Sequence, residues 1–240
     1  MVFMIKYLKK LKQEAVFKPN FISFIFNPFY IVRKDLYQNI KSLAIHIDGK
    51  ILDVGCGSKP YQDLFINKST YVGLEYESSV LNEKKVKVEY TYQGDQFPFN
   101  NHHFDSVVCF QVLEHVFNAE TFVREIHRVV KSNGKVLLTV PFVWDEHEQP
   151  YDFGRYSSYG LKALFERNGF KVRSQFKSTT GFRAILQLII LSIYKSLLKN
   201  KVVNYLILPI PNFITNLLSC FIPEKSNDFY MDNIILLEKV

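Results

Sequence analysis

Short apolar runs alternate with amphipathic stretches in the middle of the chain. The runs are rich in Val, Ile, Leu and Tyr and predict five strands, at residues 50–55, 70–76, 86–92, 104–110 and 135–141. Near-continuous apolar runs are typical of strands buried on both faces of a parallel sheet. Between the last two, apolar residues recur at helical spacing from Phe122 to Val130. We expect this helix to begin after Asn118 and to end at Asn133-Gly134.

The pattern continues beyond Pro141. A polar, aromatic loop is followed by a predicted helix at 159–169, which ends at Gly169, and by predicted strands at 170–179 and 232–240. Alternating strands and helices indicate helices on both faces of a parallel sheet. The fold class is therefore α/β, with a doubly wound, mostly parallel sheet of seven strands.

An apolar insertion separates the last two strands. Its uncharged stretches are 184–194, which is too short to span a membrane, and 202–223, which Pro209 and Pro211 interrupt. We expect two short helices, with three roles open: packing, a membrane or lipid-substrate role, or a dimer surface. The predicted organisation is an N-terminal helical extension (1–40), a main domain (41–181 and 226–240) and an apolar helical insertion (182–225).

Composition and charge narrow the possible classes of protein and of binding partner. With 48% hydrophobic and 22% charged residues, the chain is expected to be globular, and three scattered Cys favour a reducing compartment. The net charge of +7 comes largely from residues 1–18 and 185–222, which are also apolar. This favours an anionic membrane surface over nucleic acid, although a solvated Lys face gives the same pattern. We expect a cytoplasmic protein, peripheral on the inner membrane face.

The segment with candidate chemistry runs from Ile51 to Pro60 and predicts a strand, a glycine turn and a helix. Gly55 and Gly57 allow a ligand close to the backbone, and the N-terminus of the expected helix would attract acceptor groups. Glu75 lies 20 residues beyond Gly55, where an acid can bind ribose hydroxyls. Pro60 replaces the third glycine of a dinucleotide motif. The pattern therefore favours ribose and adenine without a diphosphate.

Four segments in order, LDVGCGSKPY, YVGLEYE, GDQFPFNNHHFDSVVCFQVLEHV and REIHRVVKSNGKVLLTVPF, resemble class I S-adenosylmethionine-dependent methyltransferases, and most closely the type 11 group. The segment HEQPYDFGRY is also similar to members linked to glycan or lipid-linked substrates. The resemblance covers about residues 20–180 and the last strand. It implies the Rossmann-like methyltransferase fold and S-adenosyl-L-methionine as cofactor.

The same resemblance assigns roles to individual residues. It implies that Asp53, Gly55 and Gly57 belong to the loop around the methionine part of the cofactor and that Glu75 is the acid on the ribose. It also implies that Asp95 with Gln96 contacts the adenine and that Phe110 with Gln111 lies near the sulfonium. Structural alternatives stay open: Asp53 and Asp95 as turn residues, Glu77 in place of Glu75, and Phe110 as core.

Candidate catalytic residues lie in the loop after 135–141, at the carboxyl edge of the sheet, where ligands bind in such folds. His147 is our candidate general base, Asp152 would orient it or bind substrate, and Arg155 would bind an anionic group of the acceptor. Alternatively, the loop is a structural lid with an internal Asp–Arg pair. For His115, a capping role and a substrate-facing role both stay open. No spacing of His, Cys and acids is typical of a metal site, so none is expected.

The function expected from these features is methyl transfer to a small-molecule, saccharide or lipid-linked acceptor, through oxygen. One alternative is a quinone or isoprenoid methyltransferase, with the apolar insertion as a wall for its substrate. Another is a non-catalytic nucleotide-binding scaffold, which would have no need of Glu75 and Asp95 together with the glycine loop. Neither the acceptor nor the oligomeric state follows from the sequence.

Overall fold

A computed structural model describes residues 16–77, 88–197, 207–223 and 228–240 of the chain. It divides into two compact units. Unit 1 comprises residues 1–39 and 177–231, and unit 2 comprises residues 40–176 and 232–240. The predicted extension is described only from residue 16 onward, and residues 86–87 of the expected third strand lie outside the described parts.

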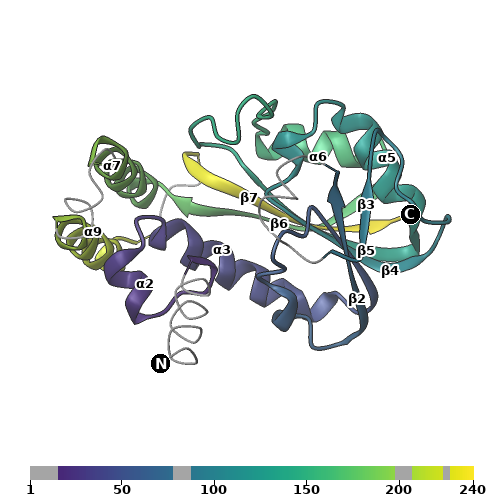
Figure 1. Ribbon diagram of the computed structural model, residues 1–240, viewed down its shortest axis with the longest axis horizontal. Coiled ribbons are helices and arrows are strands. Elements are labelled where there is room, and N and C mark those ends of the chain that lie inside the picture. Colours follow the sequence, from purple (N-terminus) through teal and green to yellow (C-terminus); the bar gives the residue numbers. More distant parts are fainter. Residues whose placement is uncertain (1–15, 78–87, 198–206, 224–227) are drawn as a thin grey trace. The chain divides into compact units, whose positions relative to one another are not determined.

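The sheet has seven strands in the order β3-β2-β1-β4-β5-β7-β6 (Figure 1). Their bounds are Gly49–Val54 (β1), Lys68–Tyr76 (β2), Tyr90–Tyr92 (β3), Phe104–Phe110 (β4), Val130–Pro141 (β5), Phe170–Thr180 (β6) and Tyr230–Lys239 (β7). β1 pairs in parallel with both β2 and β4, whereas β5 and β7 are antiparallel. The predicted mostly parallel, seven-stranded sheet is confirmed.

The helices of unit 2 follow the predicted pattern with one difference in length. α5 (Ala119–Val129) begins where the Asn118 side chain accepts a hydrogen bond from the Thr121 amide at 3.2 Å. It ends at Val129, four residues before the predicted stop at Asn133. Val130 already pairs with Phe104 of β4, so sheet pairing overrides the helical pattern. α6 (Ser158–Glu166) matches the second predicted helix.

The expected helix after the glycine turn is absent. The described chain between β1 and β2 contains only the single 3₁₀ turn η2 (Gln62–Leu64). Lys59, directly before Pro60, has a φ of 54°, which lies outside the right-handed helical region, and the few residues left before β2 form only this 3₁₀ turn. Two more 3₁₀ turns, η1 (Ala44–His46) and η3 (Leu113–His115), follow α3 and β4.

The hydrophobic core of unit 2 holds the strand ends in place. It joins the central strands to the inward faces of α5 and α6, where Phe122, Ile126, Val129 and Leu161 are almost fully buried. Cys56 and Cys109 are buried free thiols, as expected for small hydrophobic residues. Because the core is continuous beneath β1, β4 and β5, the loops at their carboxyl ends have a rigid base.

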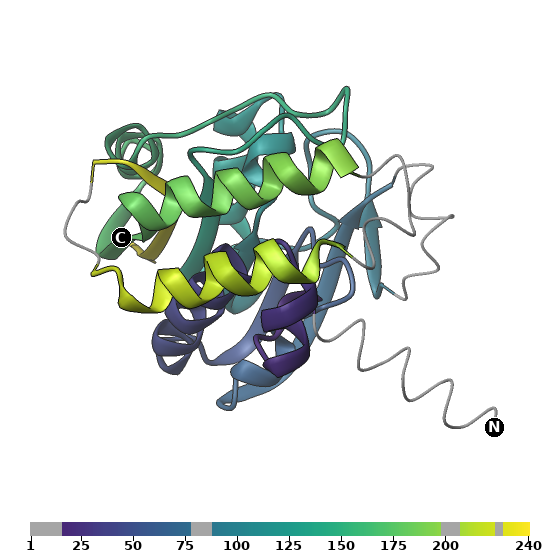
Figure 2. The same ribbon diagram turned by 90° about the vertical axis from the view of Figure 1, so that its left-hand side faces the viewer.

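Unit 1 is mainly helical. It contains α2 (Phe21–Phe26), most of α3 (Tyr30–Leu43), α7 (Phe182–Leu197) and α9 (Pro209–Phe221). Figure 2 shows α7 and α9 side by side, and α9 also packs against α2. The two short helices predicted for the insertion are confirmed. Among the described residues, no helix is both long enough and apolar enough to cross a bilayer.

Candidate functional site

The glycine turn after β1 is tightly held. The amide of Gly55 donates to the carbonyl of Leu74 at 2.8 Å, and both Gly55 and Gly57 have positive φ, at 68° and 46°. A Cβ at Gly55 would lie 2.3 Å from Cγ2 of Val112, in the loop after β4. A Cβ at Gly57 would meet nothing within 4 Å. Gly55 therefore permits close packing, whereas Gly57 leaves open space at the mouth of the turn.

Glu75 lies at the carboxyl end of β2, beside this turn. Its Oε2 accepts a hydrogen bond from the Gly57 amide at 2.9 Å. The predicted ribose-binding acid and the predicted cofactor loop are therefore in direct contact. Glu77, the alternative acid, instead accepts a hydrogen bond from the Gln93 side chain at 2.9 Å.

Asp53 is almost fully buried within β1, beneath the turn. The hydroxyl of Tyr71 on β2 donates to its Oδ2 at 2.7 Å. Burial raises the pKa of Asp53 to about 7, an effect that the Tyr71 hydrogen bond opposes and the nearby charge of Glu75 increases. Asp53 thus supports the turn from below.

Asp95 and Gln96 are exposed in the segment that follows β3. The next residue, Phe97, anchors this segment: it is buried, and its amide donates to Glu125 of α5 at 2.8 Å. Burial raises the pKa of Tyr92 at the end of β3, and the charges of Glu75 and Asp95 add to that effect. The charges of the predicted ribose and adenine acids therefore both act on this tyrosine.

Phe110 is the last residue of β4, and Gln111 follows it. The Phe110 ring contacts Tyr61 at 5.2 Å between centroids and stacks on Phe65 at 6.3 Å, next to the glycine turn. Gln111 has a φ of 56°, and its Nε2 donates to Thr139 Oγ1 on β5 at 3.2 Å. Since β3, β2, β1 and β4 are adjacent and parallel, all the predicted cofactor residues lie on these strands or follow their carboxyl ends.

The loop after β5 is organised around Asp152. This buried carboxylate pairs with both terminal nitrogens of Arg155, at 2.5 and 2.7 Å, and accepts from the backbone amide of His147 at 2.9 Å. The hydrogen bonds and charge of Arg155 hold the pKa of Asp152 well below its usual range. The structure thus brings the three predicted catalytic residues together and contains the internal Asp–Arg pair of the lid interpretation.

Two residues after β4 join this cluster. Glu114 is fully buried, neither of its carboxylate oxygens is hydrogen-bonded, and burial raises its pKa to about 8. Its backbone carbonyl accepts from the amide of Phe153 at 2.7 Å, which ties the loop to η3. The rings of His115 and His147 meet edge to face at 4.7 Å. Sequence reasoning missed Glu114; its one signal is an acid within an otherwise apolar run.

Glu114, His115 and His147 could together hold a cation, because their ligand atoms lie within 4.8 Å of one another. Nδ1 of His115 is 2.6 Å from the Tyr151 carbonyl, and Nδ1 of His147 is 3.2 Å from the Asp145 carbonyl. A carbonyl only accepts, so both Nδ1 atoms carry the proton and each Nε2 keeps its lone pair for a proton or a metal.

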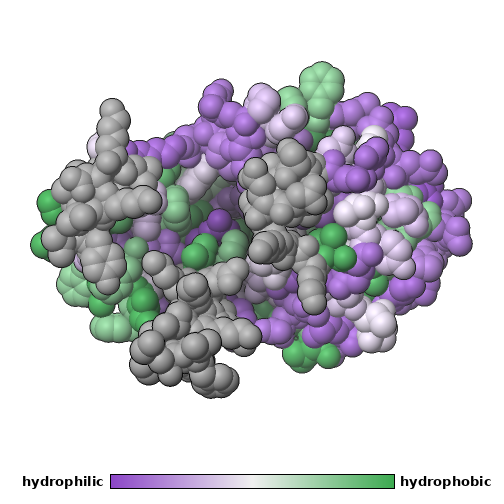
Figure 3. All heavy atoms as spheres, viewed as in Figure 1, coloured by the Kyte–Doolittle hydropathy of each residue, from purple (hydrophilic) through white to green (hydrophobic). Residues whose placement is uncertain are grey.

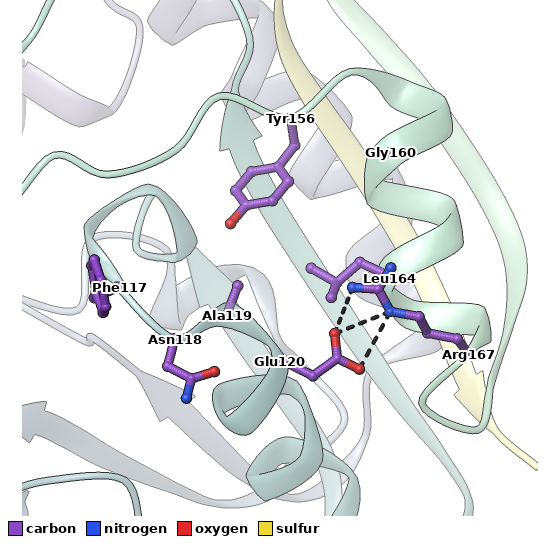
Figure 4. Close-up of a pocket in the computed structure, with 8 residues that line it drawn as sticks. All are labelled: Phe117, Asn118, Ala119, Glu120, Tyr156, Gly160, Leu164 and Arg167. Carbon is purple, nitrogen blue, oxygen red and sulfur yellow. Dashed lines mark hydrogen bonds and ion pairs between the residues drawn. The ribbon is translucent and has the colours of Figure 1, made fainter.

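A shallow groove between α5 and α6 lies outside this arrangement (Figure 4). It is lined by Phe117, Asn118, Ala119, Glu120, Tyr156, Gly160, Leu164 and Arg167. An ion pair between Arg167 and Glu120 closes one side of it, at 2.5 Å. None of the predicted site residues lines the groove, so we do not assign it to the cofactor.

The protein has an α/β fold in which the predicted cofactor residues lie on neighbouring parallel strands or follow their carboxyl ends. Residues 52–138 match the family model described as a methyltransferase domain. Over these residues the chain matches a methyltransferase domain, and it is similar to the class I S-adenosylmethionine-dependent methyltransferases of the type 11 group.

Curated relatives agree with this assignment. An uncharacterized methyltransferase, YcgJ of Bacillus subtilis, is 30% identical over 50% of this chain and 49% of its own length. The ubiquinone biosynthesis O-methyltransferase of Pseudomonas syringae is 30% identical over 38% of this chain and 43% of its own. The chain thus spans about half the length of the curated relatives it matches.

Solved structures share the fold. A phosphoethanolamine N-methyltransferase of Haemonchus contortus, in complex with S-adenosyl-L-methionine, gives a TM-score of 0.53 at 18% identity, over 84% of this chain and 52% of that one. The [4+2]-cyclase SpnF gives 0.57 at 17% identity, over 88% and 82%. Because the second structure is named a cyclase, the fold alone does not define the reaction.

The residues present fit the family's cofactor, S-adenosyl-L-methionine. Gly57 leaves room where a side chain would otherwise stand, and Glu75 offers carboxylate oxygens beside it for a ribose diol. Asp95 follows β3, which neighbours β2, and Phe110 is the last residue of β4, which neighbours β1. Glu75 would hold the ribose, Asp95 the adenine, and Phe110 the methionine end.

Asp53 gives a test of this site through pH. Its pKa is raised from 3.8 to about 7 in the folded protein, so the folded state binds more protons than the unfolded chain between these values. Its contribution to stability is complete below pH 4 and is lost as the pH rises through 7. Relative to Asp53→Asn, the free energy of unfolding of the wild-type protein should fall by about 2 kcal/mol between pH 5 and 7.

Denaturant unfolding at pH 5, 6, 7 and 8 measures this difference. Leu138→Ala, which changes a buried residue without a titratable group, should shift the whole curve in parallel. Parallel curves for Asp53→Asn and the wild type would show that Asp53 ionises equally in both states.

Proposed function

We propose that the protein transfers the methyl group of S-adenosyl-L-methionine to an oxygen of a small-molecule, saccharide or lipid-linked acceptor. The observation that carries this proposal is the contact of Glu75 with the glycine turn, within a chain segment that matches a methyltransferase domain. A non-catalytic scaffold would have no use for the cluster of His115, His147 and Glu114 at the same edge of the sheet.

The position of that cluster supports chemistry on the acceptor. It follows the ends of β4 and β5, and Phe110 and Gln111 lead from β4 directly to Glu114 and His115. When bound, the cofactor supplies an electrophilic methyl group on its sulfonium. The chain then has to align the acceptor oxygen, exclude water and take up one proton, and alignment contributes the larger part of the rate.

His147 is placed to take that proton. Its side chain is partly exposed, and with Nδ1 turned toward the Asp145 carbonyl and Asp152, Nε2 makes no hydrogen bond to a described residue. Asp152 orients the ring, and Arg155 neutralises Asp152, so these two are positioning residues in the proposal. The quinone alternative uses the same groups with a phenolic acceptor, and the similarity to an O-methyltransferase of ubiquinone biosynthesis favours an oxygen.

The cofactor site is tested by calorimetric titration with S-adenosylhomocysteine. Glu75→Ala should weaken binding at least about thirtyfold, since it removes charge-assisted hydrogen bonds to the ribose. Glu77→Ala removes an acid two residues further along and should bind like the wild type. Equal affinity for Glu75→Ala and the wild type would reject the ribose role of Glu75. A wild-type protein that is folded but does not bind would reject the cofactor assignment for this chain.

The proton-accepting role is tested by His147→Ala, with turnover measured on the first active acceptor from a panel of phenols, saccharides and lipid-linked sugars. We expect turnover to fall about 100-fold while the affinity for S-adenosylhomocysteine changes less than twofold. His46→Ala, which changes an exposed histidine, is the matched control. Unchanged turnover in His147→Ala would remove His147 from the mechanism.

A divalent cation held by Glu114, His115 and His147 would lower the pKa of an acceptor hydroxyl by a different route. The specific observation in its favour is the buried carboxylate of Glu114, which makes no hydrogen bond to any residue that the structure describes and whose Oε1 lies 3.7 Å from Nε2 of His115. Under this alternative, chelation with EDTA abolishes turnover, Mg²⁺ or Mn²⁺ restores it, and His115→Ala is as damaging as His147→Ala. Turnover that is insensitive to EDTA leaves His147 as a metal-free base.

A further inference from the structure

Helix α9 in unit 1 has its polar side inward and its apolar side outward. The buried side chains are polar: Asn212, Thr215, Asn216 and Ser219. The exposed ones are large and apolar: Ile210, Phe213, Ile214, Leu217, Leu218 and Phe221, of which Ile210 is 63% and Phe221 78% exposed. This order is the reverse of that in an ordinary surface helix of a protein in water.

Hydrogen bonds fix α9 in this orientation. The Nδ2 of Asn212 donates to the carbonyl of Ile25 at 2.8 Å, and that of Asn216 donates to the carbonyl of Phe24 at 2.7 Å. Both acceptors belong to the end of α2, where helical carbonyls have no partner within the helix. Rolling α9 to bury its apolar side would break these bonds and leave the carbonyls unsatisfied.

The neighbouring helices also expose apolar side chains, although α7 buries Ala184, Leu186, Ile190 and Leu191 beside one polar residue. On α7, the buried Gln187 donates through Nε2 to the carbonyl of Pro28 at 2.7 Å and accepts through Oε1 from the amide of Val32 at 3.2 Å. The outward positions of α7 are Phe182, Ile185 and Ile189, and those of α2 are Phe21, Ile22 and Phe26.

Together, the exposed apolar residues of α2, α7 and α9 form what we call the apolar face. Phe24 of α2 contacts Phe213 of α9 edge to face at 5.7 Å, so the two helices are in direct contact. Figure 3 shows hydrophobic atoms gathered at the left, where Figure 1 places α9. Contiguous patches of this kind mark interaction sites in water-exposed proteins.

The charge of unit 1 indicates what covers this face. Unit 1 contains 13 Lys and Arg against 4 Asp and Glu, a formal charge of +9, so unit 2 carries −2 of the chain's +7. None of the three helices contains an acidic residue. Of the acids in the described part of unit 1, Asp35 is buried against Arg183 at 2.6 Å, which leaves Asp228 as the exposed one.

We propose that the apolar face binds the surface of an anionic lipid bilayer. The apolar side chains would enter the boundary between headgroups and acyl chains, while Lys and Arg of the same basic unit would contact lipid phosphates. A second copy of this chain fits less well, because it would bring two units of charge +9 together. The described helices lie on the bilayer in this proposal and do not cross it. The proposal is independent of the methyl-transfer reaction.

The test is co-sedimentation of the full chain with vesicles of phosphatidylcholine, alone or with about one third phosphatidylglycerol. We expect at least about tenfold more bound protein on the anionic vesicles, and a loss of binding as NaCl rises from about 0.1 to about 0.5 M. The double variant Leu217→Gln, Leu218→Gln should reduce binding at least about tenfold.

Matched controls separate docking from folding. Ile45→Gln with Ile66→Gln changes two exposed apolar residues of unit 2, at 65% and 79% exposure, and should bind like the wild type. Unchanged thermal melting shows that the double variant is folded; if it is not, Ile210→Gln with Ile214→Gln on the same face replaces it. Glu75→Ala should still bind vesicles, so failure of the cofactor site is distinguishable from failure of docking.

Three results would overturn the proposal. The first is no sedimentation above the protein-only background, and the second is equal binding to neutral and anionic vesicles. The third is dimerisation without vesicle binding, detected by sedimentation velocity and abolished by Leu217→Gln with Leu218→Gln, which would assign the apolar face to a second copy of the chain.

Discussion

The parallel pairing of β1 with both β2 and β4 is the constraint on which the candidate site depends. In that pairing Asp53 lies opposite Gly73 on one side and Val108 on the other, so the three strands end at one edge. The turn after β1 then packs against Val112, with no room for a side chain at Gly55. Glu75 reaches Gly57 only because β2 is held in this register. The cofactor residues are thus a product of strand pairing more than of local turn geometry.

Much of this arrangement could be predicted from the sequence. Residues 51–54 are apolar except for Asp53, and residues 107–110 are apolar throughout; such runs have few alternatives to a buried strand. Glu75 could be identified because one strand and one turn fix its distance from Gly55. The end of α5 could not be predicted, because it depends on the pairing of Val130 with Phe104. The conformation after Gly57 could not be predicted either, because it depends on the few residues available before β2. Local patterns carry no information on such constraints.

The catalytic cluster shows the same limit. The residue type alone identifies His147 as a candidate base. Its orientation depends on Asp152 and Arg155, and their contacts are known only from the folded loop. Glu114 and His115 are 33 and 32 residues from His147, and only the adjacency of β4 and β5 brings them near it. A buried acid without a hydrogen-bond partner is costly, so its presence beside two histidines indicates a functional demand on that position.

The inverted polarity of α9 also affects how the chain can vary. In most helices the inward positions accept many apolar residues of similar volume, and the outward positions accept almost any polar one. In α9 the inward amides Asn212 and Asn216 are tied to two particular carbonyl groups, so even apolar residues of similar size would be poor replacements. The outward positions are limited only in being apolar. Homologous chains that keep this unit should therefore be nearly constant at the buried polar positions and interchange Leu, Ile and Phe freely on the outside.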